Sequence, residues 1–154
     1  MNFYEINSST LCLMELKNGN TYVIEEEAEF EVKANIHKIV DESCRSFGSS
    51  LEGRLLGTTK LTNTRYKAPI LVSESLNIIL LPTGSRRGEI CHWWSFNCIK
   101  DYDEIKVVES NKYKSYVRFV NDKIVNLEIT KNILKNQMNK CAMLKHCLEL
   151  KNRG

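Results

Sequence analysis

The first third of the chain alternates apolar and polar residues, which is the pattern of half-buried β-strands. Residues 9–15 and 21–25 form two such runs. They flank Asn18-Gly19, the kind of dipeptide that most strongly favours a hairpin turn. Residues 29–34 alternate again. We therefore predict a β-hairpin followed by a third strand.

Beyond the third strand, the apolar spacing changes to three or four residues, as on one face of an α-helix. The members of this stripe are Ile36, Ile39, Val40, Ser43, Cys44 and Phe47. Gly48 would end the helix. Ser49 and Glu52 have the spacing of a capping box, and Gly57 stands where a left-handed C-terminal cap would fall. A short second helix is therefore predicted at residues 50–56.

The two predicted helices and their glycine-containing link superficially resemble a helix-turn-helix. The second helix would have only about two turns and carries Gly53 in its middle. That is short for a recognition helix in a major groove, so we do not favour this interpretation.

The rest of the chain predicts several strands and then one long helix. The predicted strands are residues 70–72, 78–81, 90–99, 106–109, 113–120 and 124–129. From Thr130, a typical N-cap residue, apolar positions at helical spacing continue through Leu148. The sum is an α+β fold with a largely antiparallel β-sheet, two short central helices and a long C-terminal helix.

The chain has 154 residues, which is the size of one domain. We assign residues 1–154 to a single domain, with strands at 1–34, the two central helices within 35–100 and the last helix at 130–150. No apolar run approaches the roughly 20 residues that span a bilayer. The N-terminus lacks the basic and apolar regions of a signal peptide. We expect a cytoplasmic protein with no membrane partner.

Charge is distributed unevenly, although the net charge is only +3. Residues 1–34 contain two lysines and seven glutamates, whereas residues 131–154 contain six basic residues and one glutamate. Residues 45–67 hold Arg45, Arg54, Lys60, Arg65 and Lys67 against Glu52 alone. Such clustering predicts a positive face for a polyanion, although a solvated surface can have the same composition.

The turn between the predicted helices is rich in glycine, serine and arginine, as is common where a backbone meets an anion. Free amides and the macrodipole at a helix N-terminus favour phosphate. The amides after Gly48, with Ser49 and Ser50, would face such a phosphate. Arg45 and Arg54 would add positive charge. An ordinary tight turn explains the same residues equally well.

Two further features can contact nucleic acid. Residues 84–88 form a predicted cationic loop that contains Arg86 and Arg87. Such a loop can enter a minor groove or grip phosphate, and a solvated hairpin tip is the equal alternative. Trp93 and Trp94 would face opposite sides of one strand. One joins a core, and for the other we favour packing under a helix over stacking on a base or a dimer interface.

The sequence lacks the usual catalytic motifs, such as H-E-x-x-H, G-x-S-x-G and the phosphate-binding glycine loops. Its six cysteines include no C-x-x-C pair, the spacing typical of zinc sites. Buried free thiols are the commoner state. We expect no enzyme, no metal and no cofactor. Folding can still bring either of two groups together into a metal or thiol site. One group is Cys91, His92 and Cys98, and the other is Cys141, His146 and Cys147.

A longer pattern resembles a known family. It reads Ile39-Val-Asp-x-Ser-Cys-Arg-x-Phe-Gly-Ser-Ser-x-x-Gly-Arg-x-x-Gly-Thr58 and continues through Lys67-x-Pro-Ile-x-Val72, Ile79-x-Leu-Pro-Thr83, Arg87, Cys91 and Trp94. This pattern closely resembles the competence transcription factor (ComK) family of low-GC Gram-positive bacteria. Residues 35–100 carry the resemblance well, and the flanks match only in element order and spacing. The doublets Arg86-Arg87 and Trp93-Trp94 are not matched to the family.

The resemblance implies a transcriptional activator of DNA-uptake genes. It would bind paired A/T-rich boxes as a homodimer or higher oligomer, mainly through the minor groove. Narrow A/T-rich minor grooves attract arginine, so the expected groove contacts are Arg45, Arg54, Arg86 and Arg87. The expected phosphate contacts are Ser49, Ser50, Lys60, Arg65 and Lys67.

The resemblance also implies RNA polymerase and an adaptor and protease system as partners, and association with the nucleoid. The sequence ends soon after the predicted C-terminal helix, where longer family members carry a further tail, so proteolysis guided by that tail stays an open expectation. Two alternatives to DNA binding are kept: a protein-interaction module of the same fold with weak or lost DNA binding, and a metal- or thiol-dependent enzyme.

Overall fold

A computed structural model describes residues 1–84, 91–106 and 112–153. Its largest element is a six-stranded antiparallel sheet with the strand order β3-β2-β1-β6-β5-β4. The strands are β1 (Thr10–Glu15), β2 (Thr21–Glu25), β3 (Glu29–Val32), β4 (Ile70–Ser73), β5 (Ile78–Thr83) and β6 (His92–Ser95). Pairing of β1 with β6 joins the three N-terminal strands to the three later ones.

The predicted N-terminal hairpin is confirmed. β1 and β2 pair from Glu15 and Thr21 at the turn, and Gly19 in that turn has φ +87°, a conformation that favours glycine. Tyr4 ties the preceding segment to the hairpin, because its hydroxyl lies 2.5 Å from Thr10 Oγ1 and donates to the Glu25 carboxylate at 2.6 Å.

A second sheet follows the first. It contains β7 (Ile99–Glu104), β8 (Ser115–Phe119) and β9 (Ile124–Leu127), in that order. The prediction of one strand over residues 90–99 is wrong, because a short 3-10 helix, η1 (Phe96–Cys98), separates β6 from β7. The alternation rule misses β7, whose residues are mostly charged and lie at a sheet edge. Of the strand predicted at 106–109, residues 107–109 lie outside the described residues.

The first and last helices confirm the sequence prediction. α1 (Ile36–Ser46) is capped by Asn35, which accepts the His37 amide at 2.8 Å. α3 (Lys131–Asn152) is capped by Thr130, which accepts the Ile133 amide at 3.3 Å. Both caps satisfy an amide that has no partner inside its helix.

α2 (Leu51–Thr62) begins one residue later than the capping box predicts. Its N-cap is Ser50, whose Oγ accepts the Gly53 amide at 3.0 Å. The prediction that Ser49 caps this helix together with Glu52 is therefore wrong. Ser50 is the N-cap because its extended backbone directs its side chain at the first helical turn.

The end of α2 also differs from the prediction. The helix continues through Gly57 and ends at Asn63, which adopts the left-handed conformation with φ 58°. Glycine inside a helix costs about 1 kcal/mol, but packing of α2 against α1, α3 and β4 stabilises the longer helix. With 12 residues, α2 is about 18 Å long.

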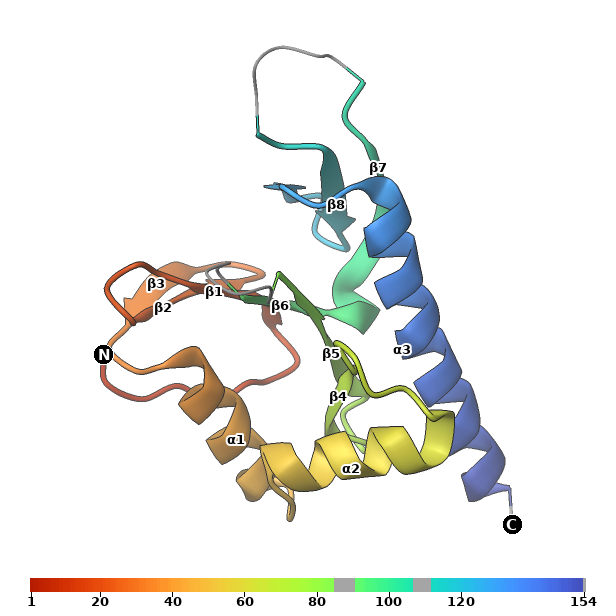
Figure 1. The fold of residues 1–154 in the computed structure, drawn as a ribbon. Coiled ribbons are helices and arrows are strands. Elements are labelled where there is room, and N and C mark those ends of the chain that lie inside the picture. Colours follow the sequence, from red (N-terminus) through yellow and green to blue (C-terminus); the bar gives the residue numbers. More distant parts are fainter. Residues whose placement is uncertain (85–90, 107–111, 154) are drawn as a thin grey trace.

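The six-stranded sheet carries a hydrophobic core on each face. α1 covers one face, whereas α3 and the three-stranded sheet cover the other (Figure 1). Trp93 belongs to the first core and is 5% exposed, and Trp94 belongs to the second and is 0% exposed. Both tryptophans are thus core residues. The architecture confirms the α+β class with antiparallel sheets and a long C-terminal helix. No helix in the described ranges combines the length and apolar character needed to cross a membrane.

Candidate nucleic-acid interface

Asp41 holds the turn between α1 and α2. One carboxylate oxygen accepts the Leu51 amide at 2.9 Å, and the other pairs with Arg45 Nε at 2.9 Å. Arg45 and then the Leu51 amide lower the pKa of the Asp41 carboxyl. The carboxylate of Asp41 therefore takes the place at the start of α2 where helix amides stabilise an anion.

Arg45 points to solvent and does not lie beneath the turn. Its side chain is 65% exposed and pairs with Asp41, four residues earlier on α1. Exposed ion pairs of this kind are weak and are screened by salt. The guanidinium of Arg45 can therefore exchange the carboxylate for a phosphate without disturbing the core.

Three amides around the start of α2 already have partners inside the protein. The Ser49 amide donates to a backbone oxygen of α1 at 3.0 Å, and the Gly53 amide donates to Ser50. A third amide donates to Asp41. These three amides are therefore not free for a phosphate, which could still contact the hydroxyls of Ser49 and Ser50 and the neighbouring arginines.

Arg54 packs into the junction between the two helices. It is half-buried, and its Nε is shielded from solvent with no hydrogen-bond partner among the described residues. Burial raises the pKa of the Cys44 thiol to about 11, and the nearby charge of Arg54 opposes that rise. Arg54 is thus partly withdrawn from solvent, in contrast to the exposed Arg45, and its contact with DNA stays a prediction.

The remaining described candidates lie at the far end of α2. Lys60 is in its last turn, and Arg65 and Lys67 follow in the segment that leads to β4. Tyr66 between them is 63% exposed, and Lys140 of α3 donates to the Tyr66 carbonyl oxygen at 2.8 Å. Neither Tyr66 nor Lys140 is among the DNA contacts predicted from the sequence. The place of Tyr66 between two predicted contacts was an available signal, but no local pattern marks Lys140.

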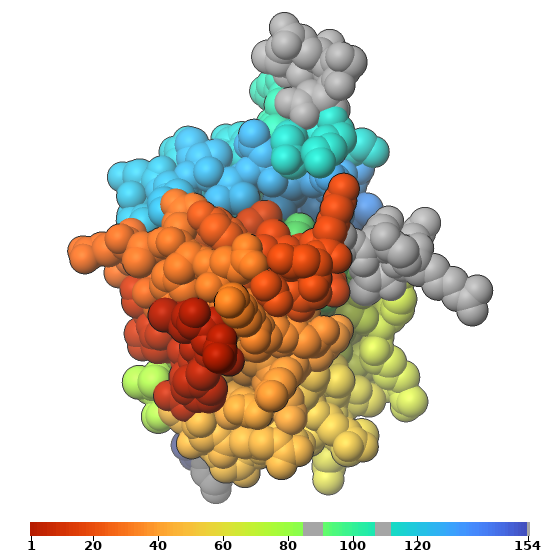
Figure 2. Space-filling model, turned by 90° about the vertical axis from the view of Figure 1, so that its left-hand side faces the viewer, coloured from red at the N-terminus to blue at the C-terminus, as the bar shows by residue number. Residues whose placement is uncertain are grey.

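The described candidates therefore form two groups, one at each end of α2. Figure 1 shows the yellow-green segment that follows the far end of α2 and leads to β4, and Figure 2 shows α1 in orange beside the start of α2 in yellow. Arg86 and Arg87 lie outside the described residues, so the structure does not relate them to either group.

Acidic residues gather at the opposite edge of the six-stranded sheet. β3 forms that edge and carries Glu29 and Glu31, whereas α2 packs against β4 at the other edge. Glu29 pairs with Lys123 at 2.7 Å, and this contact links β3 to the second sheet. A polyanion would be repelled from the β3 edge and would approach the α2 edge.

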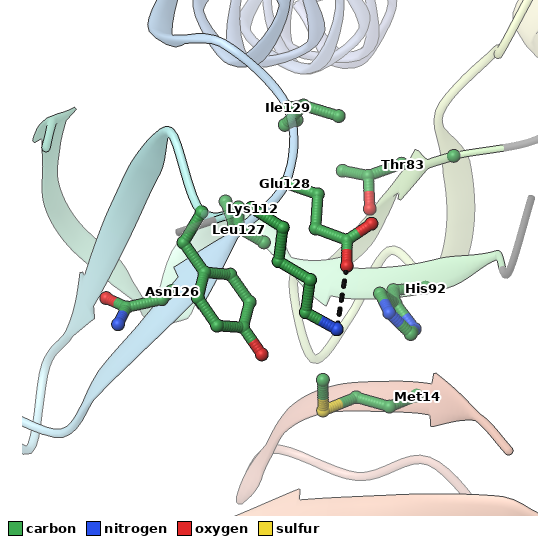
Figure 3. Close-up of a pocket in the computed structure, with 10 residues that line it drawn as sticks. Met14, Thr83, His92, Lys112, Asn126, Leu127, Glu128 and Ile129 are labelled. Atoms are coloured by element: carbon green, nitrogen blue, oxygen red, sulfur yellow. Dashed lines mark ion pairs between the residues drawn. The ribbon is translucent and has the colours of Figure 1, made fainter. Parts of the chain in front are cut away.

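A pocket of about 480 Å³ lies between the two sheets (Figure 3). Lys112 and Glu128 form an ion pair of 3.1 Å at its edge, and His92 and Met14 face them. Burial lowers the pKa of His92, which favours the neutral ring. Because Lys112 is paired and His92 is neutral, the pocket offers no unpaired cation from these side chains to attract phosphate.

The two cysteine groups considered as metal or thiol sites are not assembled. Cys91 lies in the core under α1 and Cys98 in the core on the other face of the sheet. Cys141 is buried, whereas His146 on the same helix is exposed. Across the described ranges, no three histidine, cysteine or acidic residues are arranged to hold a metal ion.

Comparison with known proteins supplies the family. The family model described as ComK protein matches residues 1–153. A protein of Bacillus subtilis (strain 168), the "Competence transcription factor", is 34% identical over 145 residues, which cover 92% of this chain and 73% of that protein. No solved structure matches this chain. The first part of the family pattern, residues 39–58, folds into α1, α2 and the turn between them, and the chain belongs to the ComK family.

Proposed function

We propose that this protein is a DNA-binding transcriptional activator of competence genes. The observation that carries the proposal is the match of the ComK family over residues 1–153, together with the relative named as a competence transcription factor. An activator of this kind needs a surface that attracts DNA and side chains that prefer particular base pairs.

The α2 edge of the molecule is the proposed DNA surface. The helix is about 18 Å long, which corresponds to about five base pairs at 3.4 Å per step. Arg45, Ser49 and Ser50 would contact the duplex at one end of α2. The contacts at the other end would be Lys60, Arg65 and Lys67. Apart from Arg45, these contacts would be to phosphates and would give affinity and orientation, since phosphates carry no sequence information directly.

Sequence preference would come from the minor groove of A/T-rich boxes. The length of α2 no longer argues against a major-groove helix, but its side chains do. Its exposed positions are Glu52, Gly53, Leu55, Leu56 and Lys60. Among the arginine, lysine, asparagine and glutamine side chains that most often read base edges in the major groove, this exposed set contains only Lys60, at the end of the helix. Arg45 is exposed and suits a narrow groove of high negative potential. Binding to paired boxes would then require two or more copies of the chain.

The proposal is tested by fluorescence anisotropy with A/T-rich and G/C-rich duplexes at two salt concentrations. We expect tighter binding to the A/T-rich duplex, and a steep loss of affinity for both duplexes at high salt. Arg45→Gln should reduce the preference for A/T, whereas Lys60→Gln should weaken binding to both duplexes alike.

Lys17→Gln is the matched control, because Lys17 lies in the β1–β2 turn, in the half of the sheet remote from β4. This variant removes the same charge and should bind as the wild type does. Absence of binding to either duplex at low salt would overturn the proposed function. Equal affinity for both duplexes would overturn the A/T preference.

A further inference from the structure

The segment between α2 and β4 is held against α3 by two consecutive carbonyl groups. Lys140 Nζ donates to the Tyr66 oxygen at 2.8 Å, and Gln137 Nε2 donates to the Lys67 oxygen at 3.2 Å. Gln137 is 3% exposed and also donates to the Pro82 oxygen at 2.7 Å. The position of this segment is therefore set by two hydrogen bonds from α3, one exposed and one part-buried, and its side chains reach the surface.

This arrangement gathers two ammonium groups at one exposed ring. Lys67 Nζ lies 5.5 Å and Lys140 Nζ 5.8 Å from the centroid of the Tyr66 ring. The backbone of Lys67 has φ 47°, the left-handed conformation, which is uncommon for a residue with a side chain. The fold thus accepts a less favourable backbone at the residue that presents one of these charges.

The two charges have no acidic partner to balance them. Neither Lys67 nor Lys140 belongs to an ion pair within the described part of the chain. Burial, followed by the charge of Lys67, lowers the pKa of Lys140. The ring of Tyr66 compensates only in part, since a cation–π contact at an exposed site is weak. An anion between the two ammonium groups would remove the repulsion.

We propose that Lys67, Lys140 and Tyr66 form a preorganised site for a single backbone phosphate of DNA. The two ammonium groups share that phosphate, and the ring of Tyr66 packs against the nucleotide beside it. This inference rests on the proposed function. It extends the DNA surface from the α2 edge to α3, which becomes part of the interface through Lys140.

The salt dependence of DNA binding tests whether one phosphate is shared. The logarithm of the binding constant falls with the logarithm of salt concentration with a slope of about 0.9 per neutralised phosphate. In the double variant Lys67→Gln, Lys140→Gln, we expect the slope to fall by about 0.9, one phosphate's share. Two separate phosphates would instead remove about 1.8.

Tyr66 is tested by a pair of substitutions. Tyr66→Ala should weaken binding roughly five- to tenfold and leave the salt slope unchanged, because an aromatic contact adds affinity without releasing counterions. Tyr66→Phe should bind as the wild type does. A reduced slope in Tyr66→Ala would contradict this role.

Lys135→Gln is the control for the loss of one lysine charge, since it removes such a charge from the exposed surface of the same helix. We expect its slope to equal that of the wild type. Thermal unfolding is followed in parallel, because Lys140→Gln also removes the hydrogen bond to Tyr66. If that variant is unstable, the single variant Lys67→Gln carries the test, since the Lys67 side chain makes no described hydrogen bond. A shared phosphate that Lys140 still holds predicts weaker binding with the wild-type slope, whereas a separate phosphate at Lys67 predicts a slope lower by about 0.9.

The outcomes separate this inference from the proposed function. If the wild type binds the duplex and the double variant keeps the wild-type slope, the site is wrong and the proposed function stands. If the salt slope of the double variant falls by about 1.8, the shared phosphate is overturned. An equal loss in Lys135→Gln shows a general charge effect and also overturns the site. If the wild type binds no duplex, the proposed function and this inference fail together.

Discussion

Asp41 connects a sequence signature to the geometry of the candidate interface. Its two oxygens contact one residue on each helix, the Leu51 amide on α2 and Arg45 on α1. The signature residue Asp41 therefore acts in the fold as an anion at the start of α2, a place where phosphate would otherwise be favoured. Asp41 therefore positions the turn, and the exposed guanidinium of Arg45 is the group available to DNA.

We predict that Asp41 makes stability depend on pH. Its pKa is lowered below the usual 3.8, first by Arg45 and then by the Leu51 amide. The folded state thus favours the ionised form, and this contribution is present at pH values above about 4 and is lost as the pH falls through the lowered pKa. In urea titrations, Asp41→Asn should be less stable than the wild type at pH 6, and the difference should vanish near pH 2.

Glu42→Gln provides the control, because it removes a carboxylate from the adjacent position of α1. Asparagine at position 41 retains an oxygen that can accept the Leu51 amide, so the comparison isolates the charge. A stability difference of constant size from pH 6 to pH 2 would contradict the role of the ionised carboxylate.

α2 is the element that separates the two groups of candidate contacts. It contains glycine at positions 53 and 57, and the two positions differ in their surroundings. A Cβ atom at Gly53 would lie 2.9 Å from Ser49 Oγ, whereas a Cβ atom at Gly57 would meet nothing within 4 Å. Packing inside the protein therefore explains the small residue at 53 but not at 57. Close approach of an outside partner to α2 would explain the second glycine.

We predict opposite effects of Gly57→Ala on stability and on DNA binding. The free energy of unfolding should rise by about 1 kcal/mol, since alanine is a better helix former and has space here. DNA affinity should fall, because the added methyl group separates α2 from the duplex. Urea unfolding and anisotropy measure the two effects. Gly53→Ala should gain less stability, since its Cβ must displace Ser49. A more stable Gly57→Ala variant with unchanged affinity would show that this surface does not contact DNA.

The whole molecule is organised around one sheet with two cores. The adjacent residues Trp93 and Trp94 belong to different cores because successive side chains in a strand point to opposite faces. Their indole nitrogens differ in hydrogen bonding. Trp94 Nε1 donates to Thr83 Oγ1 at 2.8 Å, and its ring stacks on Phe119. Trp93 Nε1 is buried and has no hydrogen-bond partner in the described ranges.

We therefore predict unequal costs for the same substitution at neighbouring positions. Trp93→Phe and Trp94→Phe both remove part of a buried indole. Trp94→Phe also leaves Thr83 without its donor, whereas Trp93→Phe removes an unsatisfied buried group. The loss in free energy of unfolding should be about 1–2 kcal/mol larger for Trp94→Phe. Urea unfolding followed by circular dichroism measures both. Equal losses would show that the hydrogen bond to Thr83 contributes nothing.

Local sequence patterns were sufficient for the elements whose signals are themselves local. The Asn18-Gly19 turn, the apolar stripe of α1 and the Thr130 cap identify a hairpin and two helices, because each depends on backbone and neighbouring side chains alone. The residues of the α1–α2 junction also carry the family signature. Fold class, charge asymmetry and family were accordingly accessible from the sequence.

Tertiary contacts decided the features that involve distant segments. α2 continues through Gly57 because three other elements pack against it, and η1 breaks the aromatic run where the chain passes from one sheet to the other. The meeting of Lys67 and Lys140 at Tyr66 has no sequence signal, since the two lysines are brought together only when α3 docks beside the segment after α2. The sequence by itself determined which chemical groups are available, and docking across the molecule determined which of them meet.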